Sequence, residues 1–298
     1  MLRLLISIIT TVLAAQAQER ATVRAVDYLA REVPRWSKAN GCFSCHNNGD
    51  GARALYVAEQ AGYRVPKSAL ADTTQWLLRP ADWDHDRTNP AFGDKKLARI
   101  QFAAALAQAY DSGAVHDRAP LSAAAESLLR YQEADGSWQV DAGSAVGSPV
   151  TYGTALSTYM ARRTLEIAGL TAPADRAKQW LLASKPHSIL DAAALLLALP
   201  ARRDCLDLIL GAQSSDGGWG PHATAAAEPF DTAVVLLALR KIDKPASIAR
   251  GRAFLIASQR PDGGWPETTR PPGGQSYAQH ISTSAWATMA LVLTDPHR

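Results

Sequence analysis

The chain has 298 residues, a formal net charge of +3 and a hydrophobic content of 47%, which is enough to bury one large core or two small ones. Its 31 Lys and Arg residues are scattered among 28 Asp and Glu residues. This distribution argues against a nucleic-acid-binding surface and against a polybasic membrane patch.

The N-terminus has the layout of an export signal. Arg3 supplies a short positive region, residues 4–13 are apolar, and residues 15–17 (Ala-Gln-Ala) form a small-x-small cleavage site. We therefore expect residues 1–17 to be removed as a signal peptide, and residues 18–298 to form a single domain in the periplasm or outside the cell. An uncleaved N-terminal anchor is the weaker alternative, and no other segment is long enough to span a membrane.

A C-x-x-C-H motif follows at Cys42, Cys45 and His46. Two thiols at this spacing can bond both vinyl groups of one haem, and the adjacent histidine then binds the iron. Because c-type haem is attached outside the cytoplasm, the motif behind an export signal favours a covalent haem whose iron is bound by His46. A Cys42–Cys45 disulfide and a zinc site completed by a fourth ligand are the alternatives.

Beyond this motif the sequence reads as a series of paired helical segments. The second segment of each pair is the more apolar, and residues 233–239 are hydrophobic all round, which indicates burial on every side. Gly, Pro and Asp cluster between the two segments of a pair, as turns require. Six pairs predict an all-α (α/α)6 toroid with its inner helices at residues 52–61, 96–110, 152–168, 189–199, 231–241 and 282–293.

In a closed ring the second and sixth hairpins both flank the first, which carries the haem motif. His85 lies in the predicted loop of the second hairpin, and His280 lies in that of the sixth. Either histidine is therefore a candidate sixth ligand of the haem iron.

A phrase that starts with Gln and ends with Asp-Gly-Gly-Trp or Asp-Gly-Ser-Trp recurs three times. It resembles the QW repeat of squalene and hopene cyclases and of protein prenyltransferase β-subunits, most strongly over residues 120–294. The resemblance implies a toroid in which these Gln and Trp side chains join adjacent repeats at the rim. We interpret all three pairs as structural: Gln132 and Trp138, Gln213 and Trp219, and Gln259 and Trp265.

The cyclases of this family also carry an Asp-x-Asp-Asp-Thr-Ala acid motif, and the matching positions here are Glu228, Phe230, Asp231 and Thr232. The resemblance assigns the proton donor to the central position, which is Phe230. A phenyl ring cannot protonate an alkene, because this step needs a carboxylic acid that is held neutral and polarised. Asp231 and Glu228 remain weak catalytic candidates, and the chain is also much shorter than the two-barrel cyclases.

Three further patterns carry less weight. The acidic run at residues 82–86 is interpreted as a solvated loop, although neighbouring carboxylates can raise one another's pKa. Asp204 and Cys205 lack the spacing expected for a prenyltransferase zinc site, and Cys205 is expected to be a buried thiol. A resemblance of residues 262–266 to family 10 pectate lyases has no recognisable Ca²⁺ site or Arg base to support it.

The sequence thus favours an exported α/α toroid with a covalent haem, acting in electron transfer or in redox-linked binding of a small or apolar molecule. A redox protein or an apolar ligand in the central cavity is the expected partner. The first alternative is a terpene cyclase or prenyltransferase-class enzyme with an unrecognised active site in that cavity. The second is a non-catalytic binding module in which Cys42 and Cys45 form a disulfide.

Overall fold

A computed structural model describes residues 2–83, 95–140, 149–270, 272–273 and 275–296 of the chain. These residues contain twelve α-helices, one π-helical turn (η1), one 3-10 helix (η2) and no strand. In chain order the elements are α1 (Leu2–Asn40), η1 (Cys45–Gly51), α2 (Ala52–Gln60), α3 (Lys67–Leu77), η2 (Pro80–Asp82), α4 (Lys95–Asp111), α5 (Ala119–Leu129), α6 (Pro149–Ala168), α7 (Thr171–Ala183), α8 (Ile189–Ala198), α9 (Arg203–Gly211), α10 (Pro229–Leu239), α11 (Pro245–Ser258) and α12 (Tyr277–Leu293).

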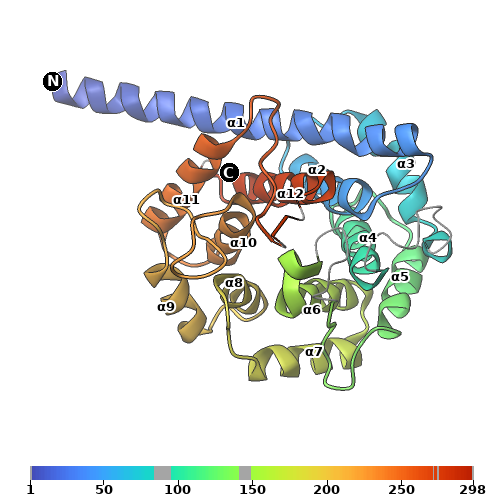
Figure 1. Cartoon of the computed structure of the whole chain (residues 1–298). Coiled ribbons are helices and arrows are strands. Elements are labelled where there is room, and N and C mark those ends of the chain that lie inside the picture. The colour runs from blue at the N-terminus through green and yellow to red at the C-terminus, as the bar shows by residue number, and fades with distance from the viewer. Residues whose placement is uncertain (1, 84–94, 141–148, 271, 274, 297–298) are drawn as a thin grey trace.

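The even-numbered helices form an inner ring, and the odd-numbered helices surround it (Figure 1). Each inner helix contacts the next, and α12 contacts α2, so the ring closes. The predicted all-α toroid is thereby confirmed. Helix α10 illustrates why the apolar pattern predicted it, because every residue from Pro229 to Leu239 is buried, as a helix without a polar face requires.

The Gln side chains of the repeat fasten each outer helix to the next one. Gln132 Nε2 donates a hydrogen bond to the carbonyl of Pro173 in α7 at 2.9 Å, and Gln213 makes the equivalent bond to α11. Gln259 reaches from the end of α11 to the carbonyl of Ala21 in α1 at 3.0 Å. The last repeat is therefore tied to the first, and the outer ring closes as the inner one does.

The Asp-Gly-Gly-Trp end of the phrase has an equally specific geometry in its second copy. Asp216 Oδ1 accepts a hydrogen bond from the Gly218 amide at 3.0 Å, which shapes the turn. Gly217 has a φ of 93°, and a Cβ there would lie 2.6 Å from a carbonyl oxygen of α11, so only glycine fits. The fully buried Trp219 donates from Nε1 to the Ile209 carbonyl at 2.7 Å, and the indoles of the other two copies make the same bond.

Helix α1 continues without a break through the cleavage site expected after Ala17, and its N-terminal end projects past the ring (Figure 1). Cleavage at that position stays a prediction. None of the helices, over the residues searched, combines the length and the apolar character that a bilayer crossing needs.

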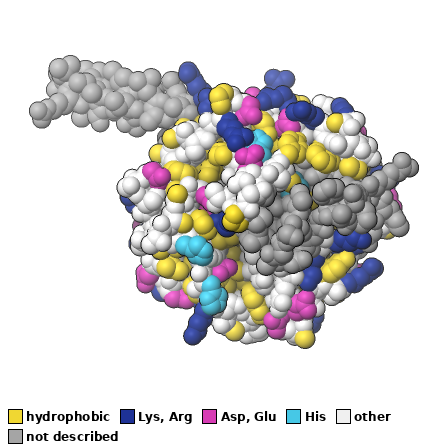
Figure 2. Space-filling view, viewed as in Figure 1, with side chains coloured by type: hydrophobic (Ala, Val, Ile, Leu, Met, Phe, Trp, Pro, Cys, Tyr) yellow, Lys and Arg dark blue, Asp and Glu magenta, His cyan; other side chains and the backbone are white. Residues whose placement is uncertain are grey.

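The surface in Figure 2 is mixed in character. Basic, acidic and apolar side chains are interspersed over the described part of this face. The three-dimensional arrangement on this face therefore keeps the scattered charge pattern of the sequence.

Candidate functional site

The inner ring buries the carboxyl group of Asp50. This residue belongs to the π-helical turn η1, which precedes α2, and it has no exposed surface. Glycine on either side permits close approach of the backbone to other helices. A Cβ on Gly49 would lie 3.1 Å from Gln101 Cβ in α4, and one on Gly51 would lie 2.9 Å from Val33 Cγ2 in α1. Wide turns of this kind occur frequently at functional sites.

One oxygen of Asp50 is surrounded by hydrogen-bond donors. Its Oδ2 atom accepts from Gln101 Nε2 at 2.6 Å, from Ser282 Oγ at 2.8 Å and from the Tyr152 hydroxyl. These donors come from α4, α12 and α6, so the side chain of Asp50 is held by three inner helices. The other oxygen, Oδ1, is buried and has no hydrogen-bond partner among the described residues.

This environment makes Asp50 keep its proton to a higher pH than an ordinary carboxyl group. Burial raises the pKa of Asp50 to about 6, although the three donors and the Arg53 charge act in the opposite direction. Since the donors occupy Oδ2, a bound proton is best placed on Oδ1. The arrangement provides a buried carboxylic acid whose conjugate base is stabilised in advance.

Three aromatic side chains form a cluster beside Asp50. The rings of Tyr152 and Phe230 have centroids 5.3 Å apart, and the Trp286 ring lies 6.1 Å from Tyr152 and 5.9 Å from Phe230. Trp286 Nε1 donates to the Tyr152 hydroxyl at 2.8 Å, which orients the donor to Asp50. The Arg53 guanidinium already lies over the Trp286 ring, 5.0 Å from its centroid. Such ring faces attract positive charge.

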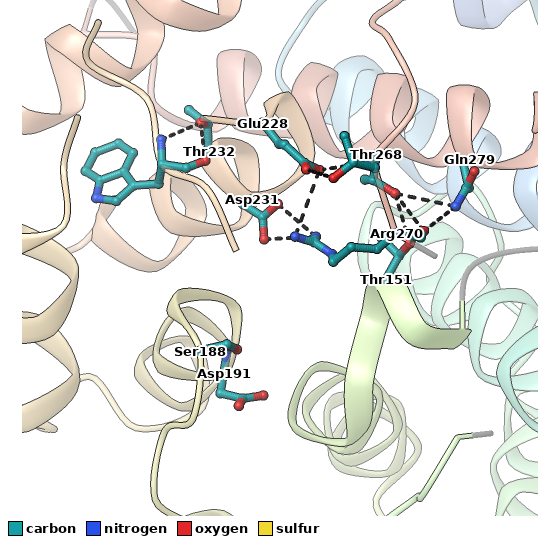
Figure 3. A network of polar contacts seen from close by, with 11 residues as sticks. Thr151, Ser188, Asp191, Glu228, Asp231, Thr232, Thr268, Arg270 and Gln279 are labelled. Atoms are coloured by element: carbon teal, nitrogen blue, oxygen red, sulfur yellow. Dashed lines mark hydrogen bonds and ion pairs between the residues drawn. The ribbon is translucent and has the colours of Figure 1, made fainter. Parts of the chain in front are cut away.

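A second carboxyl cluster lies at the start of α10 (Figure 3). Arg270, from the segment between α11 and α12, places Nη2 3.0 and 2.8 Å from the two oxygens of Asp231 and Nη1 3.9 Å from Glu228. The Arg270 carbonyl accepts hydrogen bonds from Thr151 at 2.8 Å and from Gln279. These contacts fix the segment between α6, α10 and α12.

The two buried aspartates differ in how they can use a proton. Burial also raises the pKa of Asp231 to about 6, against the Arg270 charge. Both oxygens of Asp231, however, accept from the guanidinium, so a proton there would displace an ion-pair contact. Oδ1 of Asp50 has no such contact to lose. Asp231 is therefore suited to holding Arg270, and Asp50 is suited to donating a proton.

The C-x-x-C-H motif lies at the entry to η1. His46 is 9% exposed, its Nδ1 lies 3.0 Å from Ser282 Oγ, and burial lowers the pKa of His46 to about 4, so the ring is neutral at pH 7. Cys42 is buried and Cys45 is half-buried, and no disulfide joins them in the described loop. Across the described residues, no three His, Cys, Asp or Glu side chains are arranged to hold a metal ion, so the zinc alternative lacks a ligand set.

The two candidate sixth ligands have different outcomes. His85 lies outside the described residues. The expectation that His280 lies in a loop was wrong, because a capping box at Ser276 starts α12 ahead of it. Its ring packs edge-on against Tyr28 with centroids 5.6 Å apart, and its Nδ1 lies 3.2 Å from Arg260 Nη1. His280 is therefore engaged by α1 and by the turn after α11.

The other sequence candidates lie away from this centre. Asp82 forms an ion pair with Arg79 at 3.5 Å on the surface, and residues 84–86 of the acidic run lie outside the described part of the chain. Cys205 is fully buried in α9, and Asp204 pairs with a neighbouring arginine at 2.7 Å. Among the described residues, Asp204 and Cys205 belong to no group of three potential metal ligands.

Sequence reasoning missed Asp50 and its partners Gln101, Tyr152, Ser282 and Trp286. The run that contains Asp50, Asn-Asn-Gly-Asp-Gly, has the composition of an exposed turn. Gln101, Tyr152 and Ser282 are 51, 102 and 232 positions away from it along the chain. One usable signal was Gln101, a polar residue directly before the apolar run of residues 102–107 in an inner helix.

Comparison with known proteins found one partial sequence match and several solved structures with a similar fold. No family model matches the chain. A segment of 65 residues is 38% identical to drimenyl diphosphate synthase of Streptantibioticus cattleyicolor, over 22% of this chain and 12% of that enzyme. The match therefore spans about an eighth of the length of that relative.

The fold is that of a type II terpene cyclase. The structure resembles a variant of the cyclase MstE from Scytonema in complex with its substrate, geranylgeranyl dihydroxybenzoate, with a TM-score of 0.63 over 95% of this chain and 99% of that chain at 15% identity. The TM-score to MstE without ligand is 0.60, again at 15% identity. The likeness at this identity concerns the fold alone. The short length of the chain relative to the two-barrel cyclases is not an argument against a cyclase, however, because MstE, which is aligned over 99% of its chain, is a cyclase of similar size.

Proposed function

We propose that this chain is a terpene cyclase-class enzyme that begins its reaction by protonating an alkene of an apolar isoprenoid, with Asp50 as the general acid. The observation that carries the proposal is the asymmetry of the Asp50 carboxyl. Its Oδ2 atom accepts three hydrogen bonds, and its buried Oδ1 atom has no partner among the described residues. The terpenoid relatives support the substrate class.

The first step transfers the proton of Asp50 Oδ1 to one carbon of a double bond. The π electrons of that bond form the new C–H bond, and the second alkene carbon becomes a carbocation. Asp50 is left as a carboxylate, whose charge Gln101, Tyr152 and Ser282 stabilise without moving. Because the site excludes water, the cation is protected from premature capture.

The following steps form the rings of the product. The π electrons of the next double bond attack the carbocation, which forms a C–C bond and moves the positive charge along the chain. Loss of a proton to water from the carbon beside the final cation leaves a new C=C bond and ends the sequence, and Asp50 regains a proton from solvent when the product leaves. The faces of Tyr152, Phe230 and Trp286 are placed to stabilise the moving charge. Since these rings are fully buried, the substrate has to displace part of their packing to reach Oδ1.

The test is incubation of the purified chain with farnesyl diphosphate, geranylgeranyl diphosphate and squalene in D₂O. A product that is cyclic and carries one added deuterium at the protonated carbon is expected with at least one substrate, because Asp50 exchanges its proton with solvent before each turnover. Mass spectrometry of the extracted products, after phosphatase treatment where needed, reads out both features. Only linear products from all three substrates would contradict the proposal.

Haem attachment stays a second proposal, favoured by the complete C-x-x-C-H motif behind a predicted export signal. Cys42 and Cys45 would hold the group through thioethers, and His46 would bind its iron, supplying redox chemistry. The described conformation does not fit a haem, because the His46 ring is buried and bonded to Ser282. Attachment therefore requires the segment around residues 41–46 to open.

This proposal has a direct spectroscopic test. Protein matured together with a haem-attachment system is expected to show a Soret band that shifts on reduction, and its haem should survive acid–acetone extraction because thioethers do not release it. His46→Ala should disturb the iron spectrum. Colourless protein with a Cys42–Cys45 disulfide, detected by mass spectrometry, would contradict haem attachment.

A further inference from the structure

Arg53 carries a positive charge inside the ring that is not paired with a hydrogen-bond acceptor. It lies at the start of α2, one helical turn after Asp50. Its Nη1 atom is buried and has no hydrogen-bond partner in the described part of the chain. Burial lowers the pKa of the Arg53 guanidinium, but an arginine remains protonated in proteins. Because burying an uncompensated charge costs free energy, packing alone does not account for this residue.

The surroundings of Arg53 leave no room for a counter-ion. The cavity beside it has a volume of about 10 Å³, which is enough for about one water molecule. Residues of α4 and α6 line the rest of this cavity, and none of them is a carboxylate. Arg163, which also lines it, is paired with Asp111 of α4 at 3.5 Å. The charge of Arg53 therefore acts on its neighbours without being neutralised locally.

Arg53 acts on one corner of the aromatic cluster. Its guanidinium carbon lies over the Trp286 ring, 5.0 Å from the centroid, so one face of that ring already holds a cation. The Tyr152 and Phe230 rings are 5.3 Å apart and lie 6.1 and 5.9 Å from Trp286. A second positive charge on the other face of Trp286 would be roughly 10 Å from Arg53. At an effective dielectric constant of about 20, the repulsion lowers its population on the order of tenfold.

We infer that Arg53 is a product-determining residue, whose fixed charge keeps the carbocation off Trp286 and holds it between Tyr152 and Phe230 until the final proton is lost. The inference rests on the proposed function for the existence of the cation. Ring closures that would place positive charge beside Trp286 are slowed, and those that place it between the other two rings are not. Arg53 itself neither gives nor takes a proton, and its effect on the route is electrostatic.

The product mixture tests this role. In Arg53→Met, which removes the charge and keeps an extended side chain, the ratio of the main cyclic product to the minor ones should fall about tenfold by gas chromatography and mass spectrometry. Arg53→Gln is the second neutral variant and should give the same change, whereas Arg53→Lys keeps the charge and should keep the wild-type ratio. Arg163→Met, which removes the neighbouring paired charge, is the matched control and should also keep it. An unchanged ratio in both neutral variants, or an equal change in Arg53→Lys, would overturn the inference.

A binding measurement tests the charge effect without turnover. The probes are N,N-dimethylfarnesylamine, which is an ammonium ion at pH 7, and farnesyl methyl ether, a neutral molecule of similar shape. Titration calorimetry compares Asp50→Asn with Asp50→Asn/Arg53→Met. Removing Arg53 should raise the affinity for the amine about tenfold and leave that for the ether unchanged. Equal changes for both probes, or no change for the amine, would contradict the inference. Absence of cyclisation by the wild type would refute the proposed function instead, and the amine-specific gain would still show that Arg53 excludes positive charge.

Discussion

Asp50→Asn is expected to slow cyclisation strongly while the fold is retained. The amide has the shape of the carboxyl group but no proton acidic enough to transfer to an alkene. General acid catalysis contributes on the order of 10² to 10⁴ in rate, so a loss of about a thousandfold is expected in the deuterium-incorporation assay. The wild-type rate should fall as pH rises above about 6, the pKa to which burial raises Asp50.

The same substitution has a signature in stability that tests the buried acid independently of any substrate. The pKa of Asp50 is raised from 3.8 to about 6 on folding, so its protonated form stabilises the native state below pH 4, and that stability is lost as pH rises through 6. Asparagine does not titrate. The free energy of unfolding of the variant should therefore rise by about 2 kcal/mol relative to that of the wild type between pH 4 and pH 8, measured by urea denaturation.

Substitutions of the two carboxyl groups at the start of α10 are the matched controls for Asp50→Asn in the cyclisation assay. Glu228→Gln is expected to keep cyclisation, because Glu228 binds Thr269 and Arg270 and not the aromatic cluster. Retained activity in Asp50→Asn together with lost activity in Asp231→Asn or Glu228→Gln would move the acid to that cluster and contradict the assignment.

Trp219→Ala is expected to lower the free energy of unfolding by about 3–5 kcal/mol, as removal of a buried aromatic ring does. The indole is fully buried, donates to Ile209, and packs so closely that a Cβ on Gly251 would lie 2.7 Å from its ring. The cavity left by alanine cannot collapse easily, because Gly251 belongs to the packed helix α11. Chemical denaturation followed by circular dichroism measures the change.

A half-buried tryptophan of an outer helix, Trp180, provides the comparison. Trp180→Ala should cost less than Trp219→Ala, because its ring is partly in solvent in the folded protein. Unchanged stability in Trp219→Ala combined with loss of ligand binding would show that the repeat tryptophan serves function and not the junction between repeats.

The toroid could be predicted from the sequence because its determinants are local. The apolar composition of a helix such as residues 229–239 predicts that it is buried. The Gln-to-Trp phrase specifies the contact between adjacent repeats, because its hydrogen-bond partners lie within ten residues or in the next outer helix. Gly217 is a further local determinant, because its positive φ and the close carbonyl of α11 both require glycine. A pattern repeated three times therefore specifies the ring.

The acid site was decided by the tertiary structure alone. Asp50 lies in a turn-like run, and only closure of the ring brings it to Gln101, Tyr152 and Ser282, which are 51, 102 and 232 positions away. The same closure buries His46 against Ser282, although the C-x-x-C-H spacing predicted that this histidine binds a haem iron. Spacing along the chain fixes local geometry, whereas burial and hydrogen bonding depend on distant helices. The pKa of a carboxyl group, and with it the chemistry available to it, follows from those distant neighbours.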